Sequence, residues 1–469
     1  MDKTNLSRRT FLHQSALTVA GLPFASSLNI GNLNHPATAL KPLQITGVNS
    51  NFEREPLLKP FGFKGGAITN VWQSIAMLEN EAGTQKMGLG TQSVLWSDSK
   101  VFAAHSENGG NALMFAMTER ALQLIKGRSF ESPIAMLDDV LEDVLEYGRQ
   151  ITGNQELRKT FALNALVPVD NAAWLLYAAE NGIDQFDDLI PANYRNGLSA
   201  RHNKVASIPA LGYGTPIDTI KGLADQGFFI MKIKIGAPGD QATMLEKDKA
   251  FLKAIHDGIG HYESAHAPNG KLPYYFDANG RYESQDTLHR FLDYAEQIGA
   301  LEQIAVMEEP FGEHNHSSVA SITDRGPRVA ADESAHTDAD AIDRIEQGYN
   351  CIALKAVAKT MSMTMKIAQA AYERQVPCFC ADLTVNPILV DWNKIVAARL
   401  PAFPGWNIGM QETNGWQNYR NWNKMMERYP MRLANWVTSR EGVYETGEAF
   451  WKKSGGIFTE SDYYKKLVS

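Results

Sequence analysis

From Ile208 onward the chain alternates short apolar runs of strand length with longer segments whose apolar residues recur at helical spacing. Such continuous apolar runs between helical segments are typical of parallel strands in repeated βα units. Eight runs have this character, which is the number of strands in a TIM-type barrel. The predicted strands are Ile208–Tyr213, Phe228–Ile235, Pro273–Ala278, Ala305–Glu309, Val329–Asp332, Cys351–Ala356, Val376–Ala381 and Asn407–Gln411.

The pattern before the barrel is different. Residues 43 to about 90 are typical of strands with turns, of which Val71–Glu79 is the longest, and the glycine-containing loop Gly62–Gly66 precedes it. From about 110 to 181 apolar residues recur at helical spacing. Strands followed by helices predict a small α+β domain. We therefore expect an α+β domain at 43–200, a β/α barrel at 201–420, and an aromatic segment at 421–469 that packs back on the first domain.

The first 30 residues carry the features of a twin-arginine export signal in the expected order. Ser7-Arg8-Arg9-Thr10-Phe11-Leu12 precedes an apolar stretch at 16–25, far shorter than the about 20 residues of a spanning helix. A tail with a chance arginine pair is the alternative. We predict a signal peptide at 1–30 that the bacterial Tat export machinery reads, a linker at 31–42, and a periplasmic or otherwise exported protein with no stable membrane span.

Composition narrows the classes of partner. The chain is 44% hydrophobic and 21% charged, with a net charge of -8, which is ordinary for a soluble globular protein and unfavourable for a nucleic-acid or anionic membrane surface. Cys351, Cys378 and Cys380 lie in apolar, strand-like runs. No zinc-ligand spacing accompanies them, so we interpret them as buried small hydrophobic residues. Whether the chain forms a homo-oligomer stays open.

Charged residues stand at the ends of five consecutive predicted strands. In chain order they are Lys232 and Lys234, Asp277, Glu308, Asp332 and Lys355. The carboxyl ends of barrel strands share one rim, where functional residues gather, so these side chains are expected to meet. Three oxygen ligands on a rigid ring suit a hard cation such as Mg²⁺. Taken singly, each acid is equally consistent with a helix cap or a solvated loop, and it is the joint pattern that favours a site.

Five motifs carry these residues in order. They are Lys232-Ile233-Lys234, Phe276-Asp277-Ala278-Asn279, Met307-Glu308-Glu309-Pro310, Ala331-Asp332-Glu333-Ser334 and Leu354-Lys355. Their order and spacing resemble the enolase superfamily and, within it, the muconate lactonizing enzyme subgroup of the mandelate racemase/muconate lactonizing enzyme family. The resemblance runs through the barrel and, more loosely, includes the first domain. It implies a modified β/α barrel with an N-terminal α+β capping domain.

The resemblance also implies a role for each motif. The implied Mg²⁺ ligands are Asp277, Glu308 and Asp332, and the implied catalysts are Lys234 and Lys355 on opposite faces of the substrate, with Lys232 supporting the substrate carboxylate. In the family the metal-binding Glu lies two places before Pro, which favours Glu308 over Glu309. Alternation along a strand lets only one of the two face the rim, but does not say which.

The chain departs from the family pattern in two places. The sixth strand continues as Lys355-Ala356-Val357-Ala358-Lys359-Thr360-Met361, where many members have Lys-x-x-Lys-Thr-Gly-Gly. Glu412-x-Asn414 is a loose analogue of the Asp-x-Asp with which dipeptide epimerases hold a substrate ammonium, and an ordinary loop acid is the alternative. The candidate substrate-binding residues are Glu412, Asp382, Lys64 and Asn279. His314 and His316 either line the mouth of the barrel or, as we favour, lie in a solvated loop.

Three functions fit this pattern. The leading hypothesis is a Mg²⁺-dependent racemase or epimerase that removes the proton α to a carboxylate, through an enediolate, in a substrate such as an N-acyl amino acid or dipeptide. A second is syn β-elimination by a dehydratase, or cycloisomerisation, which needs only one lysine for the proton. A third is an exported carboxylate-binding protein without turnover.

Overall fold

The structure is a computed structural model that describes residues 40–64 and 66–469. The predicted signal peptide at 1–30 and nearly all of the predicted linker at 31–42 lie outside these residues. Within the described part of the chain, no helix is both long enough and apolar enough to cross a membrane.

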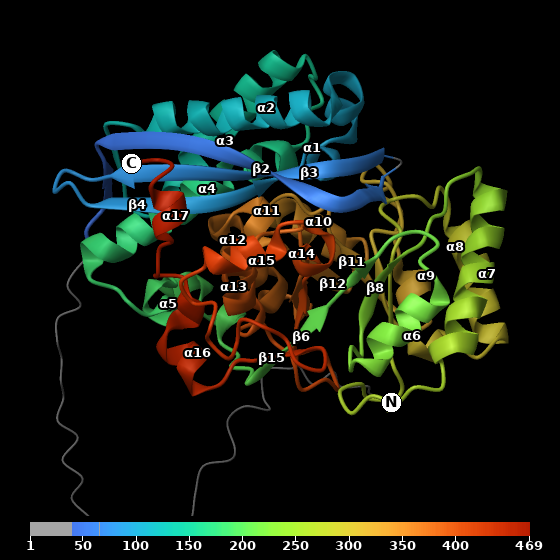
Figure 1. Cartoon of the computed structure of the whole chain (residues 1–469). Coiled ribbons are helices and arrows are strands. Elements are labelled where there is room, and N and C mark those ends of the chain that lie inside the picture. The colour runs from blue at the N-terminus through green and yellow to red at the C-terminus, as the bar shows by residue number, and fades with distance from the viewer. Residues whose placement is uncertain (1–39, 65) are drawn as a thin grey trace, which may run out of the picture. The chain divides into compact units, whose positions relative to one another are not determined.

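The predicted N-terminal α+β domain is confirmed as an antiparallel sheet, in the order β2-β3-β4, with associated helices (Figure 1). Its strands are β1 Leu43–Ile45, β2 Gly47–Phe63, β3 Gly66–Glu79, β4 Gln85–Gln92 and β5 Arg128–Phe130. Its helices are α1 Val94–Ser97, α2 Ser99–Ile125, α3 Pro133–Thr152, α4 Lys159–Asn181 and α5 Phe186–Leu189, followed by the 3-10 turns η1 Ala192–Tyr194 and η2 Asn196–Leu198. In the view of Figure 1, α2 and α3 lie above β2 and β3, and the barrel lies below them.

The helices of this domain begin earlier than the predicted position near residue 110. Asp98 caps α2 because its carboxylate accepts hydrogen bonds from the backbone N–H groups of Lys100 and Val101. The helix is kinked at Ser106, whose backbone angles are not helical (φ 65°, ψ 172°), and Gly109 and Gly110 follow this kink inside α2. A Cβ atom at Gly110 would lie 2.4 Å from a methyl group of Val94, so close packing of α1 on α2 requires the glycine.

The predicted barrel is also confirmed. Its strands are β6 Lys204–Ile208, β7 Ala210–Leu211, β8 Met231–Lys234, β9 Tyr274–Asp277, β10 Ile304–Glu308, β11 Arg328–Ala331, β12 Cys351–Leu354, β13 Cys378–Cys380 and β14 Gly409–Glu412. The helices and turns between them are α6 Ile217–Asp225, α7 Gln241–Ile259, α8 Gln285–Gln297, η3 Leu301–Gln303, α9 Ala320–Thr323, α10 Asp338–Glu346, α11 Ala356–Lys359, α12 Met361–Glu373 and α13 Pro387–Ala397. Every pairing among these strands is parallel, as repeated βα units require.

The first barrel strand differs from the prediction of one run at 208–213. It begins at Lys204 and is divided by Pro209, which has no N–H to donate to a neighbouring strand. The part before Pro209, β6, pairs with β14, and the part after it, β7, pairs with β8. This one segment therefore joins the first and last strands and closes the ring of eight.

The C-terminal segment contacts both parts of the molecule. It contains α14 Gly415–Asn418, α15 Trp422–Glu427, β15 Val443–Glu445, α16 Glu448–Lys452, η4 Ser454–Gly456 and α17 Asp462–Lys465. Strand β15 adds to β6 in the antiparallel direction. On the capping side, Asn49 donates to the carbonyl of Val468 at 2.8 Å, and Arg428 lies 3.2 Å from Glu53. Residues 41–469 form a single unit, and the predicted boundaries at 200 and 420 stay predictions.

Candidate active site

The six charged side chains predicted from the strand ends lie together at the carboxyl ends of β8 to β12, and all are buried. Strand register places them side by side. Lys234 pairs with Asp277 on the next strand, and Asp277 pairs with Glu308 on the one after. Neighbouring strands lie about 4.8 Å apart, so groups in register reach hydrogen-bond distance.

Lys232 lies among three carboxylates. Its Nζ is 2.9 Å from Asp277 Oδ2, 2.8 Å from Glu308 Oε1 and 3.1 Å from Glu412 Oε2. Burial disfavours the charged ammonium, but the three carboxylates outweigh it and raise the pKa of Lys232 well above its ordinary value. Lys232 is therefore a fixed positive charge, suited to stabilising negative charge on a ligand.

Lys234 shares Asp277 with Lys232. Its Nζ donates to Asp277 Oδ2 at 2.5 Å and to Asn279 Oδ1 at 2.7 Å. Burial would raise the pKa of Asp277, but the two ammonium groups reverse this effect and lower it to about 2. Asp277 stays ionised between the two lysines, which offsets their mutual repulsion.

Lys355 approaches the site from the opposite side of the barrel. The strands β8 and β12 are four steps apart in the ring of eight. Lys355 Nζ donates to Asp332 Oδ2 at 2.5 Å and lies 4.4 Å from the centre of the Trp96 ring. Burial opposes the charge, but Asp332 outweighs it and raises the pKa of Lys355.

Another buried lysine, Lys359, hydrogen-bonds to the backbone of the loop that contains Asp332. Lys359 Nζ donates to the carbonyl oxygens of Asp332 at 2.6 Å and Ala335 at 2.9 Å. Burial would raise the pKa of Asp332, but Lys355 and Lys359 together lower it. The sequence pattern marked Lys359 only as a departure from the family motif, and its contacts show that it anchors the loop after β11.

Three buried carboxylates could hold a divalent cation. Glu308, Asp332 and Glu333 each offer an oxygen, and these atoms lie within 4.8 Å of one another. Asp332 Oδ1 and Glu333 Oε2 are buried and accept no hydrogen bond among the described residues, although Lys359 Nζ lies 3.4 Å from Asp332 Oδ1. Unpartnered buried carboxylate oxygens fit a hard cation such as Mg²⁺, which takes oxygen ligands. This group contains Glu333, which the resemblance did not imply as a ligand. Asp277, which the resemblance did imply, is not one of the three and instead pairs with Lys232 and Lys234.

The side chains of the neighbouring residues Glu308 and Glu309 make different contacts. Glu308 belongs to the carboxylate group, and its Oε2 also accepts from the hydroxyl of Tyr275. Burial raises the pKa of Glu308 to about 8 against the opposing effect of Lys232. Glu309 instead accepts from the backbone N–H of Asp332 at 2.7 Å and that of Ser334 at 3.3 Å. Of the two, Glu308 is therefore the one placed to bind a metal, and Glu309 fixes the loop after β11.

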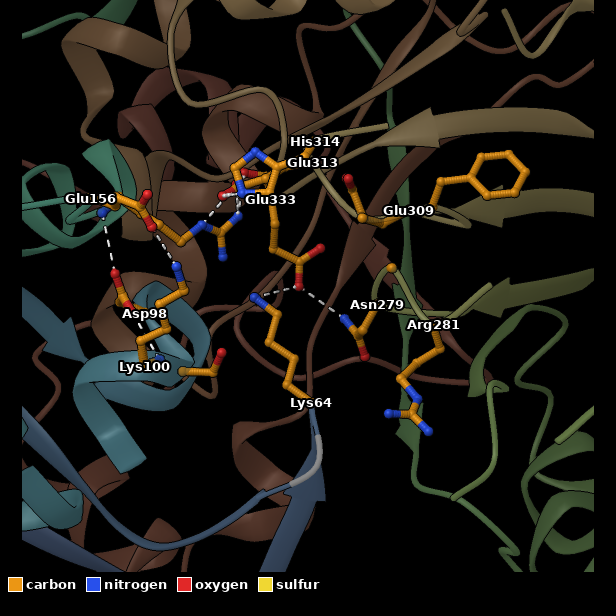
Figure 2. Close-up of a pocket in the computed structure, with 15 residues that line it drawn as sticks. Lys64, Asp98, Lys100, Glu156, Asn279, Arg281, Glu309, Glu313, His314 and Glu333 are labelled. Carbon is orange, nitrogen blue, oxygen red and sulfur yellow. Dashed lines mark hydrogen bonds and ion pairs between the residues drawn. The ribbon is translucent and has the colours of Figure 1, made fainter. Parts of the chain in front are cut away.

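Two cavities meet at this site. The inner one, of about 40 Å³, lies among the three lysines and is closed on the capping side by Phe61, Phe63, Ile68 and Trp96. The outer one, of about 250 Å³, is lined mainly by polar side chains. In Figure 2, Glu333 lies between Lys64 and Asn279, and its Oε1 is 3.1 Å from Lys64 Nζ and 2.9 Å from Asn279 Nδ2. Asn279 lines both cavities.

Asp382 and Glu412 line the inner cavity, but their oxygens are engaged. Glu412 Oε2 accepts from Lys232 and from the backbone N–H of Asp382, and its Oε1 accepts from Asn414 Nδ2. Asp382 accepts from the backbone N–H groups of Leu383 and Asn414, each at 2.8 Å. Burial, with the nearby charge of Glu412, raises the pKa of Asp382 to about 7. These carboxylates hold the turns after β13 and β14 together.

Several solved structures share the fold of this chain. No protein-family model matches the chain, and no curated protein matches it. Among solved structures, a dipeptide epimerase from Enterococcus faecalis complexed with Mg and L-Leu-L-Tyr is 18% identical, with a TM-score of 0.54 over 79% of this chain and 90% of that chain. The L-Ala-D/L-Glu epimerase from Bacillus subtilis is 16% identical, with a TM-score of 0.58 over 81% and 91%. A member of the enolase superfamily from Listeria innocua is 19% identical, with a TM-score of 0.57 over 80% and 87%.

The chain has the enolase-superfamily fold. The N-succinyl Arg/Lys racemase from Bacillus cereus shares it at 14% identity, with a TM-score of 0.59 over 80% of this chain and 89% of that chain. The inner cavity of this chain joins the rim residues of β8 to β14 to capping-domain residues such as Phe63 and Trp96.

Other residues singled out in the sequence lie away from this chemistry. Both histidines are exposed: His314 is 89% exposed and lines the outer cavity, and His316 lies two residues further along the same loop. All three cysteines are buried and unpaired, as predicted.

Sequence reasoning missed Glu333 and Trp96. The motif Ala331-Asp332-Glu333-Ser334 contained a signal for Glu333, but nothing in the sequence connected Trp96 with the barrel rim.

Proposed function

We propose that this chain is a Mg²⁺-dependent racemase or epimerase of the enolase superfamily that acts at the carbon α to a carboxylate. One observation carries the proposal: Lys234 and Lys355 lie on strands half a ring apart and line the same buried cavity. A lysine on each side permits a proton to leave one face of the α-carbon and return to the other, which inverts the centre. The structural neighbours that are named as dipeptide epimerases and as a racemase support this reaction class.

The proposed metal ligands are Asp277, Glu308 and Asp332, with Glu333 adjoining them. The grouping of Glu308, Asp332 and Glu333, with a buried Glu333 Oε2 that has no partner among the described residues, supports a cation at this place. When bound, Mg²⁺ would polarise the substrate carboxylate and lower the cost of the negative charge that develops as the α-proton leaves.

The lysines would divide the remaining work. Lys232 is a fixed cation, so it would bind the substrate carboxylate and stabilise the enediolate charge. Lys355 donates to Asp332 and would give a proton to the α-carbon in one direction of the reaction. Lys234, in its neutral amine form, would accept the α-proton from the opposite face. In the reverse direction the roles of Lys234 and Lys355 exchange.

Deuterium exchange tests the reaction class. Purified protein, Mg²⁺ and a library of chiral carboxylates are incubated in D₂O, and the products are examined by NMR and chiral chromatography. The proposal expects deuterium at the α-carbon, formation of the opposite stereoisomer, and loss of both on adding EDTA. An alkene product would show elimination, a cyclised product would show cycloisomerisation, and Mg²⁺-dependent binding without exchange would show a carboxylate-binding protein. Each of these three results contradicts the proposal.

We further propose that residues 1–30 direct export of the chain through the Tat machinery. The support is the sequence alone, in which Arg8 and Arg9 precede a short apolar stretch. Replacing both arginines by lysine in the full chain should retain the protein in the cytoplasm of a Tat-competent bacterium. Equal periplasmic yield from the variant and the wild type would contradict this proposal.

A further inference from the structure

Three histidines that the proposed reaction does not use line a third cavity, of about 250 Å³. His314 and His316 come from the loop after β10, and His336 comes from the loop after β11. The cavity shares Glu313 and His314 with the outer cavity. Imidazole nitrogens bind cations such as Zn²⁺, whereas Mg²⁺ takes oxygen ligands. The side chains of this cavity therefore offer a different coordination chemistry from the carboxylates at the barrel rim.

Glu313 brings two of these imidazoles together. Its Oε2 lies 3.2 Å from His336 Nε2, and its Oε1 lies 3.8 Å from His314 Nε2 (Figure 2). Zinc bonds of about 2.0–2.1 Å in a tetrahedral arrangement place neighbouring ligand atoms about 3.3 Å apart. As the side chains stand, these groups are less closely gathered than the carboxylates of the rim. A cation bound to Glu313 reaches both imidazoles once His314, whose side chain is 89% exposed, turns toward it.

A buried arginine holds the loop that carries His314 and His316. Arg344 is only 5% exposed, and its guanidinium donates to the carbonyl of Asn315 at 2.8 Å and to the carbonyl of Glu313. The backbone on both sides of His314 is therefore fixed. Only side-chain freedom is lost when His314 binds a cation, which lowers the entropic cost of binding.

Two buried polar atoms beside these ligands have no hydrogen-bond partner among the described residues. They are His336 Nδ1 and the hydroxyl of Ser334, and both residues line the cavity. Ser334 is only 4% exposed. Buried polar atoms are almost always satisfied, so the two atoms indicate that something further occupies this cavity. A hydrated cation supplies a partner, because its water molecules can form hydrogen bonds with the Ser334 hydroxyl.

The charge around the cavity favours a cation. The carboxylates of Glu313, Asp340 and Asp343 line it, against the single guanidinium of Arg344. Arg158 also lies 2.5 Å from Glu313 Oε2. Because Arg158 occupies Oε2, the other oxygen, Oε1, is the one available to a cation.

We propose that Glu313, His314 and His336 form a second metal site, separate from the rim, for a divalent cation of the Zn²⁺ class that prefers imidazole nitrogen, with His316 as a further ligand. Arg158 caps α4 of the N-terminal domain and contacts the same carboxylate. A cation on Glu313 therefore lies where this domain meets the barrel loops. Since it binds the folded chain, it should also stabilise the fold.

Calorimetric titration with Zn²⁺ tests the site in the full chain, purified without a polyhistidine tag and in excess Mg²⁺. One Zn²⁺ should bind per chain. His314→Gln and His336→Gln should each weaken Zn²⁺ binding at least about tenfold, because each removes a nitrogen ligand. His261→Gln is the matched control, since His261 is exposed but lies outside this cavity. It should bind Zn²⁺ as the wild type does.

The outcomes do not depend on the proposed function, because binding is measured without a substrate. Absence of Zn²⁺ binding in excess Mg²⁺ would overturn the inference. Equal Zn²⁺ binding by the wild type, His314→Gln and His336→Gln would overturn it as well, as would an equal loss in His261→Gln. Thermal unfolding gives a second readout: Zn²⁺ should raise the unfolding temperature of the wild type more than that of His314→Gln. The same rise in both would place the bound Zn²⁺ elsewhere and contradict the site.

Discussion

At the scale of single residues, the site is a balance of buried charges. Lys232 and Lys234 project from one strand, a costly arrangement in a barrel interior unless carboxylates surround it. The structure supplies them, since Asp277 Oδ2 lies within 2.9 Å of both ammonium groups and Glu308 and Glu412 complete the surroundings of Lys232. Removing any one of these charges should therefore affect its neighbours as well as its own function.

The metal ligands can be ranked by calorimetric titration with Mg²⁺. Glu308→Gln and Asp332→Asn should each weaken Mg²⁺ binding by at least about tenfold, because each removes a charged oxygen ligand. We expect Asp277→Asn to weaken it more than Glu333→Gln does, because the proposed ligand set contains Asp277, whereas Glu333 only adjoins it.

The opposite ranking of Asp277→Asn and Glu333→Gln would make Glu333 the third ligand, as the grouping of oxygens in the structure favours. Glu246→Gln is a suitable control because the Glu246 side chain is 74% exposed on α7. It should bind Mg²⁺ as the wild type does.

At the scale of elements, the sequence predicted all eight barrel strands because each is a short apolar run that ends in a charged residue or a turn. It misplaced the first, because the effect of Pro209 depends on which neighbour each half of the strand meets, and that is a property of the closed ring. Strand β15 also escaped prediction, since its three residues become a strand only by pairing with β6. The rim residues could be predicted because they stand at the strand ends. Trp96 could not, because it lies in the N-terminal α+β domain and reaches the rim only through packing.

The contact between helices α4 and α12 should make stability depend on pH. Asp170 on α4 accepts from the backbone N–H of Ser362 at 3.1 Å and from its hydroxyl at 2.5 Å. Burial outweighs these hydrogen bonds and raises the pKa of Asp170 from 3.8 to about 7. Because the folded state holds the proton more tightly, this contribution is complete below about pH 4 and is lost as the pH rises to about 7, by about 4 kcal/mol at most.

Asp170→Asn should abolish this dependence. Urea unfolding at pH 5 and pH 8 measures the difference in the free energy of unfolding, which should be smaller in Asp170→Asn than in the wild type. The exposed residue Asp257, varied in the same way to Asn, serves as the control. An equal pH difference in Asp170→Asn and the wild type would show that Asp170 ionises normally in the folded protein.

At the scale of the whole molecule, the C-terminal segment is attached to the barrel through hydrogen bonds to a buried ion pair on α13. Lys394 on α13 lies 2.5 Å from Asp391 Oδ1 and donates to the carbonyl of Trp436 at 2.7 Å. Asp391 Oδ2 accepts from the Trp436 indole at 3.1 Å and from the Tyr429 hydroxyl. The segment after β14 therefore depends on a charge pair that is sealed from water.

Lys394→Met should destabilise the protein by about 3–5 kcal/mol, because it leaves the Asp391 carboxylate buried without its counter-charge. The free energy of unfolding in urea measures this loss. Lys253→Met breaks an exposed pair with Asp257 and should change stability little. If the two variants lose equal stability, the buried pair does not have the structural role that we assign to it.

The central claim is that two lysines act on opposite faces of one carbon, and stereochemically resolved exchange tests it most directly. Each enantiomer of an accepted substrate is incubated in D₂O with Lys234→Ala, Lys355→Ala or the control Lys253→Ala. The account predicts that both active-site variants lose interconversion of the enantiomers by at least about 10²-fold. Each should still exchange the α-proton of one enantiomer, and the two variants should retain opposite ones. Loss of exchange with both enantiomers in one variant, and wild-type exchange with both in the other, would show that a single lysine does the chemistry and would contradict the account.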